Sequence, residues 1–365
     1  MIERIHIQNF KSIQSLELDM RPLNVLIGAN GAGKSNFISF FKLVNQIGEG
    51  RLQDYIARQN IDDLLYFGRK TSDFIHGFLD FDNTNAYAFN LRPGIDEGAY
   101  LESETTFYNQ NVTDGGPKNS RTYKSWRKWT EESNKESYLI DDKHWGAYRT
   151  LGYLRSFKIY HFHDTSDSSK MKQPCKLEDN ISLREDGSNL ASFLYLLRET
   201  DLIAYRRIEA TIHSIAPFFD KFNLKPRSLR PDEILLEWAE KGTDVYRSVH
   251  HFSDGTLRFI ALATLLLQPN LPPTILIDEP ELGLHPFAIN QLAGLIRKAA
   301  YRSQVILSTQ SVNLVNNFEP EDIIAVDRDG MDSVFHRLDS SSLETWLDTY
   351  TLSEIWDKNL IGAKP

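Results

Sequence analysis

The sequence lacks the features that would place the protein in an oxidising compartment or a membrane. It contains a single cysteine, Cys175, among 365 residues, so no disulfide can form within the chain. Its longest apolar run, residues 259–267, is far shorter than the roughly 20 residues that cross a bilayer. The chain begins with the alternating segment 2–10 in place of an apolar signal segment. We therefore expect a cytoplasmic protein without a membrane partner.

Basic residues are also in deficit. The chain has 41 Lys and Arg against 50 Asp and Glu, a net charge of −9, which disfavours nucleic acid as an obligate partner. One stretch, residues 118–128, departs from this balance and suits phosphate contact and base stacking. It contains Lys118, Arg121, Lys124, Arg127 and Lys128, interleaved with Tyr123 and Trp126. We favour a solvated loop anchored by two aromatic side chains, and DNA or RNA contact is the alternative.

No coiled-coil heptad pattern and no internal repeat is present, so the order of short elements must define the fold. Residues 2–10, 13–18 and 23–27 have the pattern of strands, and residues 36–46 have apolar side chains at helical spacing. From Ser253 onward, a helix, a strand at 274–277 and a strand at 304–307 follow one another. This alternation predicts an α/β fold with a parallel sheet.

The middle of the chain has a different pattern. Residues 74–110 contain aromatic-rich alternating strands, and residues 109–122 are polar and rich in glycine, which predicts a mobile loop. Residues 190–199 and 205–222 have apolar side chains at three- and four-residue spacing, which predicts two helices. We therefore expect a β-rich segment followed by a helical one.

Residues 28–35 match the phosphate-binding pattern G-x-x-x-x-G-K-[ST] in full, between a strand and a helix. Glycines let successive backbone N–H groups point at phosphates, and the helix N-terminus adds a positive dipole end. Lys34 would neutralise β- and γ-phosphate oxygens, and the Ser35 hydroxyl would bind Mg²⁺. The predicted nucleotide-binding residues here are Gly28, Asn30, Gly31, Ala32, Gly33, Lys34, Ser35 and Asn36.

The strand at 274–277 ends in two adjacent carboxylates, Asp278 and Glu279. A carboxylate in the position of Asp278 can hold the Mg²⁺ shell. Glu279 beside it can orient and deprotonate an attacking water. We predict Asp278 and Ser35 as metal ligands, with Glu279 and Lys34 as catalytic residues.

Residues 252–258, here called the signature turn, lie just before that strand and open an apolar helix. Ser253 or Asp254 is a good helix N-cap residue, which explains the turn locally. A serine beside the exposed N–H of Gly255 at a helix N-terminus also forms a second anion site. The sequence therefore predicts two phosphate-binding turns in one chain.

Four segments together resemble the ABC-type ATPases, namely residues 9–12, 28–35, 253–258 and 278–286. More narrowly, the chain is similar to the RecF/SMC-like branch of predicted AAA ATPases, which is related to the ATPase part of OLD-family nucleases. The resemblance implies an ABC-type head with a mostly parallel sheet, an N-terminal antiparallel β subdomain and a helical lobe. The predicted segments are 1–72 and 249–365 for the two halves of the head, 73–160 for the β-rich insertion and 161–248 for the lobe.

The same resemblance implies a head-to-tail homodimer with ATP and Mg²⁺ between its subunits. Ser253 and Gly255 of one subunit would touch the γ-phosphate held by residues 28–35 of the other. Gln310, a further predicted nucleotide-binding residue, stands where many ABC ATPases have a switch histidine. Its amide can donate to the γ-phosphate but cannot exchange protons, so we expect catalysis to depend on Glu279 and turnover to be slow. Asp254 replaces a glycine of the usual signature, which is unfavourable beside a phosphate unless Arg258 or another cation offsets it.

Two functions follow from the resemblance. The first is an ATP-driven switch that regulates a separate nuclease or toxin-like protein in a bacterial anti-phage or toxin–antitoxin-like system. The second is a DNA-maintenance ATPase that binds duplex DNA directly. A transporter ATPase is disfavoured, since no membrane segment is found in the sequence.

Three further patterns have simple explanations. His161, His163 and Asp164 could share a strand face, but no second cluster completes a metal ligand set. A role of His163, Asp164 or Lys172 in sensing bound nucleotide is the better hypothesis. Residues 327–330 predict a β-hairpin turn in place of a nuclease site. Gln53 and Gln59 are candidates for the glutamine that ABC ATPases place near the nucleotide.

Overall fold

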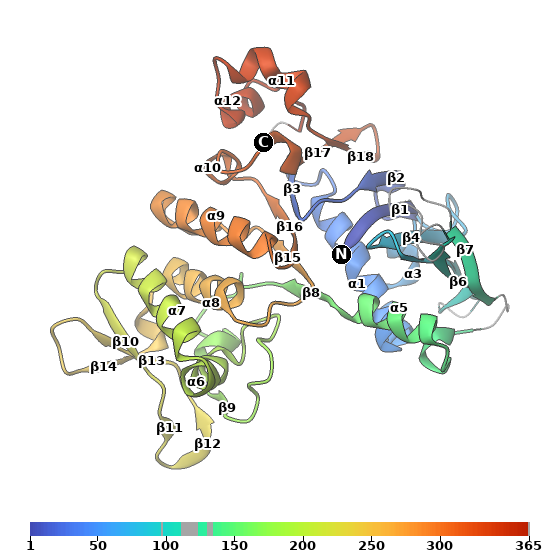
Figure 1. Cartoon of the computed structure of the whole chain (residues 1–365). Helices are drawn as coiled ribbons and strands as arrows, with labels where there is room; N and C mark the ends of the chain where they lie inside the picture. The colour runs from blue at the N-terminus through green and yellow to red at the C-terminus, as the bar shows by residue number, and fades with distance from the viewer. Residues whose placement is uncertain (96–97, 111–122, 130–133, 364–365) are drawn as a thin grey trace. The chain divides into compact units, whose positions relative to one another are not determined.

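The computed structural model describes residues 1–95, 98–110, 123–129 and 134–363 (Figure 1). The chain divides into two compact units. The first comprises Met1–Lys158 with Glu319–Pro365, and the second comprises Ile159–Phe318. The C-terminal block that we predicted as 249–365 is thus divided between both units, because β17 (Ile323–Asp329) pairs in parallel with β3 (Leu23–Ile27) of the first unit.

The first unit contains two groups of strands and the helices that cover them. Its other strands are β1 (Ile2–Phe10), β2 (Ile13–Asp19), β4 (Ile75–Phe81), β5 (Asn85–Pro93), β6 (Ala99–Asn109), β7 (Tyr123–Trp129) and β18 (Asp332–Arg337). Its helices are α1 (Lys34–Glu49), α2 (Leu52–Gln59), α3 (Ile61–Leu64), α5 (Trp145–Arg155), α11 (Ser340–Leu347) and α12 (Leu352–Asp357). Short 3-10 turns are η1 (Tyr138–Ile140) and η4 (Pro320–Asp322).

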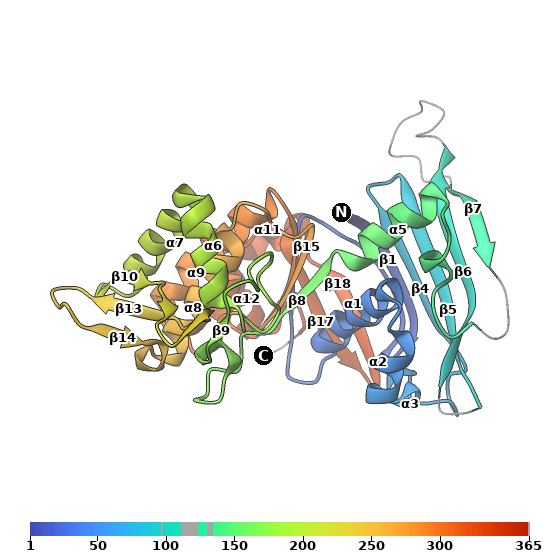
Figure 2. The same cartoon turned by 90° about the horizontal axis from the view of Figure 1, so that it is seen from below.

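The antiparallel sheet has the order β2-β1-β4-β5-β6-β7. Alternation along β1 buries Ile5 and Ile7 on one face. Figure 2 shows α1 and α5 lying along one side of this sheet. The Phe40 ring of α1 stacks on Phe89 of β5, with the ring centroids 6.1 Å apart. The core of the first unit therefore lies between α1 and the sheet.

A hairpin completes the first unit. Strands β17 and β18 pair antiparallel, as the sequence predicted for the segment around residues 327–330. All five residues of β3 are buried, which fits its continuous apolar run. Strand β3 pairs in parallel with β17 and ends at Ile27, directly before the phosphate-binding turn at residues 28–35.

The second unit holds a parallel strand pair, β15 (Thr274–Asp278) and β16 (Gln304–Thr309), beside the helices α8 and α9. Its helices are α6 (Leu190–Thr200), α7 (Leu202–Ile215), α8 (Asp254–Leu267), α9 (Pro286–Ala300) and α10 (Val312–Val315). Its remaining strands are β9 (Cys175–Lys176), β10 (Phe219–Asn223), β11 (Pro226–Arg227), β12 (Arg230–Ile234), β13 (Glu237–Glu240) and β14 (Tyr246–Ser248). The 3-10 turns are η2 (Lys170–Lys172) and η3 (Val249–His251), and β8 (Phe157–Tyr160) crosses the boundary between the units.

The α/β class is confirmed, with parallel and antiparallel strands and a helical lobe. Helices α7, α8 and α9 pack side by side (Figure 1). Residues Leu257–Leu267 of α8 are all buried, so this helix forms the centre of the second unit. None of the helices in the described ranges is both long and apolar enough to cross a lipid bilayer.

Three local predictions were wrong. Residues 161–164, expected on a strand, follow the end of β8 at Tyr160 and belong to no strand. The helix expected over residues 205–222 ends at Ile215, and residues Phe219–Asn223 form β10, because Pro217 disfavours a helical conformation at the residue before it. Part of the basic stretch 118–128, predicted to be a loop, is the edge strand β7, which pairs with β6. Lys118 and Arg121, and all but the first two residues of the loop expected at 109–122, lie outside the described residues.

Candidate functional site

The phosphate-binding turn lies between β3 and α1 in the first unit. Gly33 is the N-cap of α1 with a φ of 121°, and no side chain caps the helix there. The first N–H groups of α1 are therefore directed into the turn, as an anion site requires. The Lys34 ammonium donates to the carbonyl oxygens of Gly28 and Ala29 at 2.6 and 2.9 Å. Gly31 has a φ of 76°, with open space where a side chain would point.

Hydrogen bonds from distant segments hold this turn. The Ser333 hydroxyl of β18 donates to the Ala32 carbonyl at 2.5 Å, so it accepts from the Ser12 hydroxyl, 2.7 Å away. Ser12 in turn accepts from the Asn36 amide at 2.7 Å. These hydrogen bonds give Ser12, the last of residues 9–12, a structural role beside the turn.

Gly33→Ala is expected to weaken ATP binding by at least about tenfold, the ratio that 1.4 kcal/mol of lost binding free energy represents. A β-carbon there would lie 2.1 Å from the Ser333 hydroxyl oxygen, and the positive φ disfavours alanine. Titration of a fluorescent ATP analogue measures the loss. The control is Gly330→Ala, which has a φ of 59° and open space around it. An equal loss of ATP affinity in both variants would mean that strain at a positive φ weakens binding, and not the contact with Ser333.

The acidic pair, Asp278 and Glu279, lies at the carboxyl end of β15 in the second unit. Asp278 stands opposite Ser308 in the parallel register and accepts a hydrogen bond from its hydroxyl. Glu279 has a φ of 41°, unusual for a non-glycine residue, and its N–H donates to the Ser308 carbonyl at 3.0 Å. The Gln310 amide donates to the Glu279 carboxylate at 2.5 Å. Strand β16 thus positions both carboxylates.

A third carboxylate, Glu281, lies beneath the pair. It accepts from the Thr309 hydroxyl at 2.5 Å and from the Gln310 N–H at 3.3 Å. Burial raises the pKa of Glu281, and the hydrogen bond from Thr309 opposes that rise. Gln310 therefore binds one carboxylate through its backbone and another through its side chain, a role that the sequence did not indicate.

The signature turn begins α8 in the second unit. The Ser253 hydroxyl accepts from the Thr256 N–H at 3.2 Å, so Ser253 is the N-cap, as predicted. Gly255 lies against the loop that follows the acidic pair, since a β-carbon on it would meet the Gly283 carbonyl at 2.4 Å. The Arg258 guanidinium donates to the carbonyls of Phe162 and His163 at 2.9 and 3.0 Å. A small cavity lined by Arg258, His163, Asp278 and Glu279 adjoins it.

The minor candidates have structural partners. The His161 and His163 rings are 6.3 Å apart, and no group of three His, Cys, Asp or Glu side chains that could hold a metal occurs in the described part of the chain. Asp164 accepts from the Ser166 N–H and hydroxyl. The Gln53 amide donates to two backbone carbonyls, at Ala99 and Lys135, and Gln59 is the last residue of α2.

The predicted site residues thus form two groups. Residues 28–36 belong to the first unit, and Ser253, Gly255, Asp278, Glu279 and Gln310 belong to the second. Within each group the local geometry suits an anion or its metal. Residues 23–316 match the family described as "AAA domain, putative AbiEii toxin, Type IV TA system". The chain belongs to this family.

Curated relatives agree with this membership. The Old nuclease of Escherichia phage P2 is 25% identical over 93% of this chain, which spans 61% of that protein's length. The ATP/GTP phosphatase of Helicobacter pylori is 22% identical, with 78% of this chain and 77% of the relative covered. The chromosome partition protein Smc of Methanocaldococcus jannaschii is 32% identical, but only over 29% of this chain and 9% of its own length.

Solved structures show the same fold. An Smc head bound to the C-terminal winged-helix domain of ScpA matches with a TM-score of 0.61, 17% identity, and coverage of 93% of this chain and 99% of that one. A second Smc head, from Pyrococcus furiosus, matches with a TM-score of 0.55, 16% identity, and coverage of 95% and 98%. The predicted resemblance to ABC-type, SMC/RecF-like AAA ATPases related to OLD nucleases is confirmed.

Proposed function

We propose that the chain binds and hydrolyses ATP. Residues 28–36 would bind the phosphates, while Asp278 and Glu279 would act at the γ-phosphate. The observation that carries this proposal is the pair of hydrogen bonds that hold Glu279 in a left-handed conformation, from its own N–H to Ser308 and from Gln310 to its carboxylate. Backbone strain at a carboxylate beside a buried strand favours a functional role over a packing role.

The residues present suit the nucleotide and its metal. Gly31 has open space where a side chain would point, and the Lys34 ammonium lies at the turn, where it donates to the carbonyls of Gly28 and Ala29. The Ser35 hydroxyl and the Asp278 carboxylate are oxygen ligands of the kind that Mg²⁺ prefers. Bound Mg²⁺ would neutralise charge that develops on the β- and γ-phosphates.

Glu279 would act as the general base. Its carboxylate would accept a proton from water as that water attacks phosphorus. Gln310, which donates to Glu279, would orient the carboxylate, but it cannot accept the proton itself. Because a single group then performs the proton transfer, we propose slow turnover.

Dimerisation would complete the site. A second copy would bring Ser253 and Gly255 to the γ-phosphate, so ATP would hold two subunits together and hydrolysis would release them. The test is Mg²⁺-dependent phosphate release by the purified chain. Lys34→Ala should remove both ATP binding and release, and unchanged release in that variant would reject the proposal.

The dimer would regulate a separate protein, a nuclease or a toxin-like partner in anti-phage or toxin–antitoxin-like defence. Two observations support this role. The family description names a putative toxin of a Type IV system, and the phage P2 relative is named a nuclease. Co-purification of the chain with the product of an adjacent gene, dependent on ATP, tests it.

Direct DNA binding is the second candidate, and the position of β7 favours it. Lys124 and Lys128 are exposed on this edge strand, whereas Arg127 is paired with Asp142 at 2.6 Å. If β7 contacts phosphates, neutralising both lysines should lower DNA affinity and reduce the slope of log K against log salt by roughly two. Fluorescence anisotropy at several salt concentrations measures both. Equal replacement of Lys42 and Lys70, which lie elsewhere, is the control, and unchanged affinity after the β7 changes would make β7 an ordinary solvated strand.

A further inference from the structure

The acidic residue in the signature turn needs a compensating cation. Asp254 is the first residue of α8, and 66% of its side chain is exposed. A carboxylate suits a helix N-terminus, but it repels a phosphate that must approach the same N–H groups. The sequence suggested Arg258 or another cation as the compensating charge. The Arg258 guanidinium attracts Asp254 electrostatically, but it donates its hydrogen bonds to the carbonyls of Phe162 and His163.

Lys172 is the cation that pairs with Asp254. Its ammonium lies 3.6 Å from the Asp254 carboxylate and 3.8 Å from that of Asp167, although only 5% of the lysine side chain is exposed. A buried ammonium loses hydration, and one beside a helix N-terminus is also opposed by the helix dipole. An ordinary surface lysine would extend into water. Burying the Lys172 ammonium at this helix N-terminus therefore costs free energy that a solvated surface lysine would not incur.

The segment before Lys172 is held in place. The Ser169 hydroxyl donates to the Asp164 carbonyl at 2.6 Å and caps η2 by accepting from the Met171 N–H at 3.3 Å. The Met171 side chain packs over Gly187, where a β-carbon would lie only 2.8 Å from it. The contacts of η2 thus fix the position of the Lys172 ammonium beside the signature turn.

We propose that Lys172 is a positioning residue that neutralises Asp254, so that the signature turn can accept the γ-phosphate of an ATP held by a second copy of the chain. This inference rests on the proposed ATP-dependent dimer. It explains how an acidic residue is tolerated where ABC signatures usually have glycine. It also gives the lobe segment around η2 a direct effect on the turn that contacts ATP.

The test uses full-length protein carrying Glu279→Gln, which should keep ATP bound between subunits. Adding Lys172→Met retains the aliphatic stem and removes the charge. We expect ATP-dependent dimerisation, measured by sedimentation velocity, to weaken by about ten- to a hundredfold. ATP binding by the monomer should not change, because residues 28–36 belong to the other unit. Adding Asp254→Gly to Lys172→Met should restore dimerisation to within about threefold of the parent.

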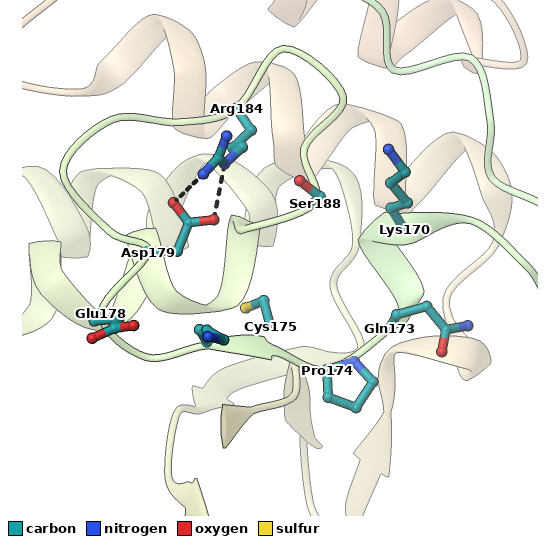
Figure 3. A pocket seen from close by; sticks show the side chains of 9 residues that line it. Lys170, Gln173, Pro174, Cys175, Glu178, Asp179, Arg184 and Ser188 are labelled. Atoms are coloured by element: carbon teal, nitrogen blue, oxygen red, sulfur yellow. Dashed lines mark hydrogen bonds and ion pairs between the residues drawn. The ribbon is translucent and has the colours of Figure 1, made fainter. Parts of the chain in front are cut away.

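The neighbouring Lys170→Met is the matched control. Lys170 is 73% exposed, is paired with Asp186 at 2.9 Å, and lines an open pocket of about 510 Å³ together with Gln173 and Arg184 (Figure 3). The Lys170→Met protein should dimerise like the parent. Normal dimerisation of the Lys172→Met protein would overturn the inference. So would a defect that Asp254→Gly fails to rescue, because the lysine would then act other than through Asp254. Failure of the parent to dimerise would instead remove the proposed function itself.

Discussion

Glu279→Gln is expected to slow ATP hydrolysis by about 10²- to 10⁴-fold and to leave ATP binding intact. The amide has the size of the carboxylate but cannot accept a proton from water. The variant should keep the Gln310 contact, since the remaining carbonyl oxygen can still accept the hydrogen bond that Glu279 accepts at 2.5 Å. Phosphate release under saturating ATP and Mg²⁺ measures the rate, and titration with a fluorescent ATP analogue measures binding.

Two comparisons make this result specific. Lys34→Ala should lose binding itself, because the ammonium that neutralises the phosphates is removed. Gln310→Ala should fall between the parent and the Glu279 variant, as the base would remain but lose its orienting donor. Equal hydrolysis by the parent and Glu279→Gln proteins would reject Glu279 as the base.

Mixing Ser253→Arg with Lys34→Ala is expected to restore activity from two inactive proteins. The arginine would fill the space in which the γ-phosphate meets the signature turn, but it would leave residues 28–36 of its own subunit intact. In a head-to-tail heterodimer both defects fall in one composite site, and the other site is wild type. Because neither variant should pair with itself, at most about half of the composite sites are wild type, and up to about half of the parent activity should return if one intact site suffices.

Each variant alone provides the control. Ser253→Arg should still bind ATP as a monomer, and sedimentation should show that it does not dimerise. A parent protein that stays monomeric in saturating ATP and Mg²⁺, yet hydrolyses at full rate, would contradict the split site. The Ser253 hydroxyl would then serve only to cap α8 through the Thr256 N–H.

Local signals in the sequence were sufficient for the elements that carry the site. Apolar runs predicted β3, β15 and β16, and the pattern of residues 28–35 predicted the turn before α1. Ser253 predicted the start of α8. These features depend on side-chain periodicity, on glycine conformation and on caps, which act over a few residues. The helix expected at 205–222 was wrong where one such local signal, Pro217, was overlooked.

Only the tertiary structure determined which side chains hold the site residues in place and which cation lies beside Asp254. Ser12 meets Ser333 across 321 positions of sequence, and the Gln310 amide meets Glu279 across 31. The sequence offered Arg258 or another cation for Asp254. In the structure the hydrogen bonds of Arg258 go to Phe162 and His163, and packing brings the Lys172 ammonium to the Asp254 carboxylate. Such contacts depend on which buried surfaces pack together, and no local periodicity encodes which polar side chains that packing brings within hydrogen-bonding or ion-pairing distance.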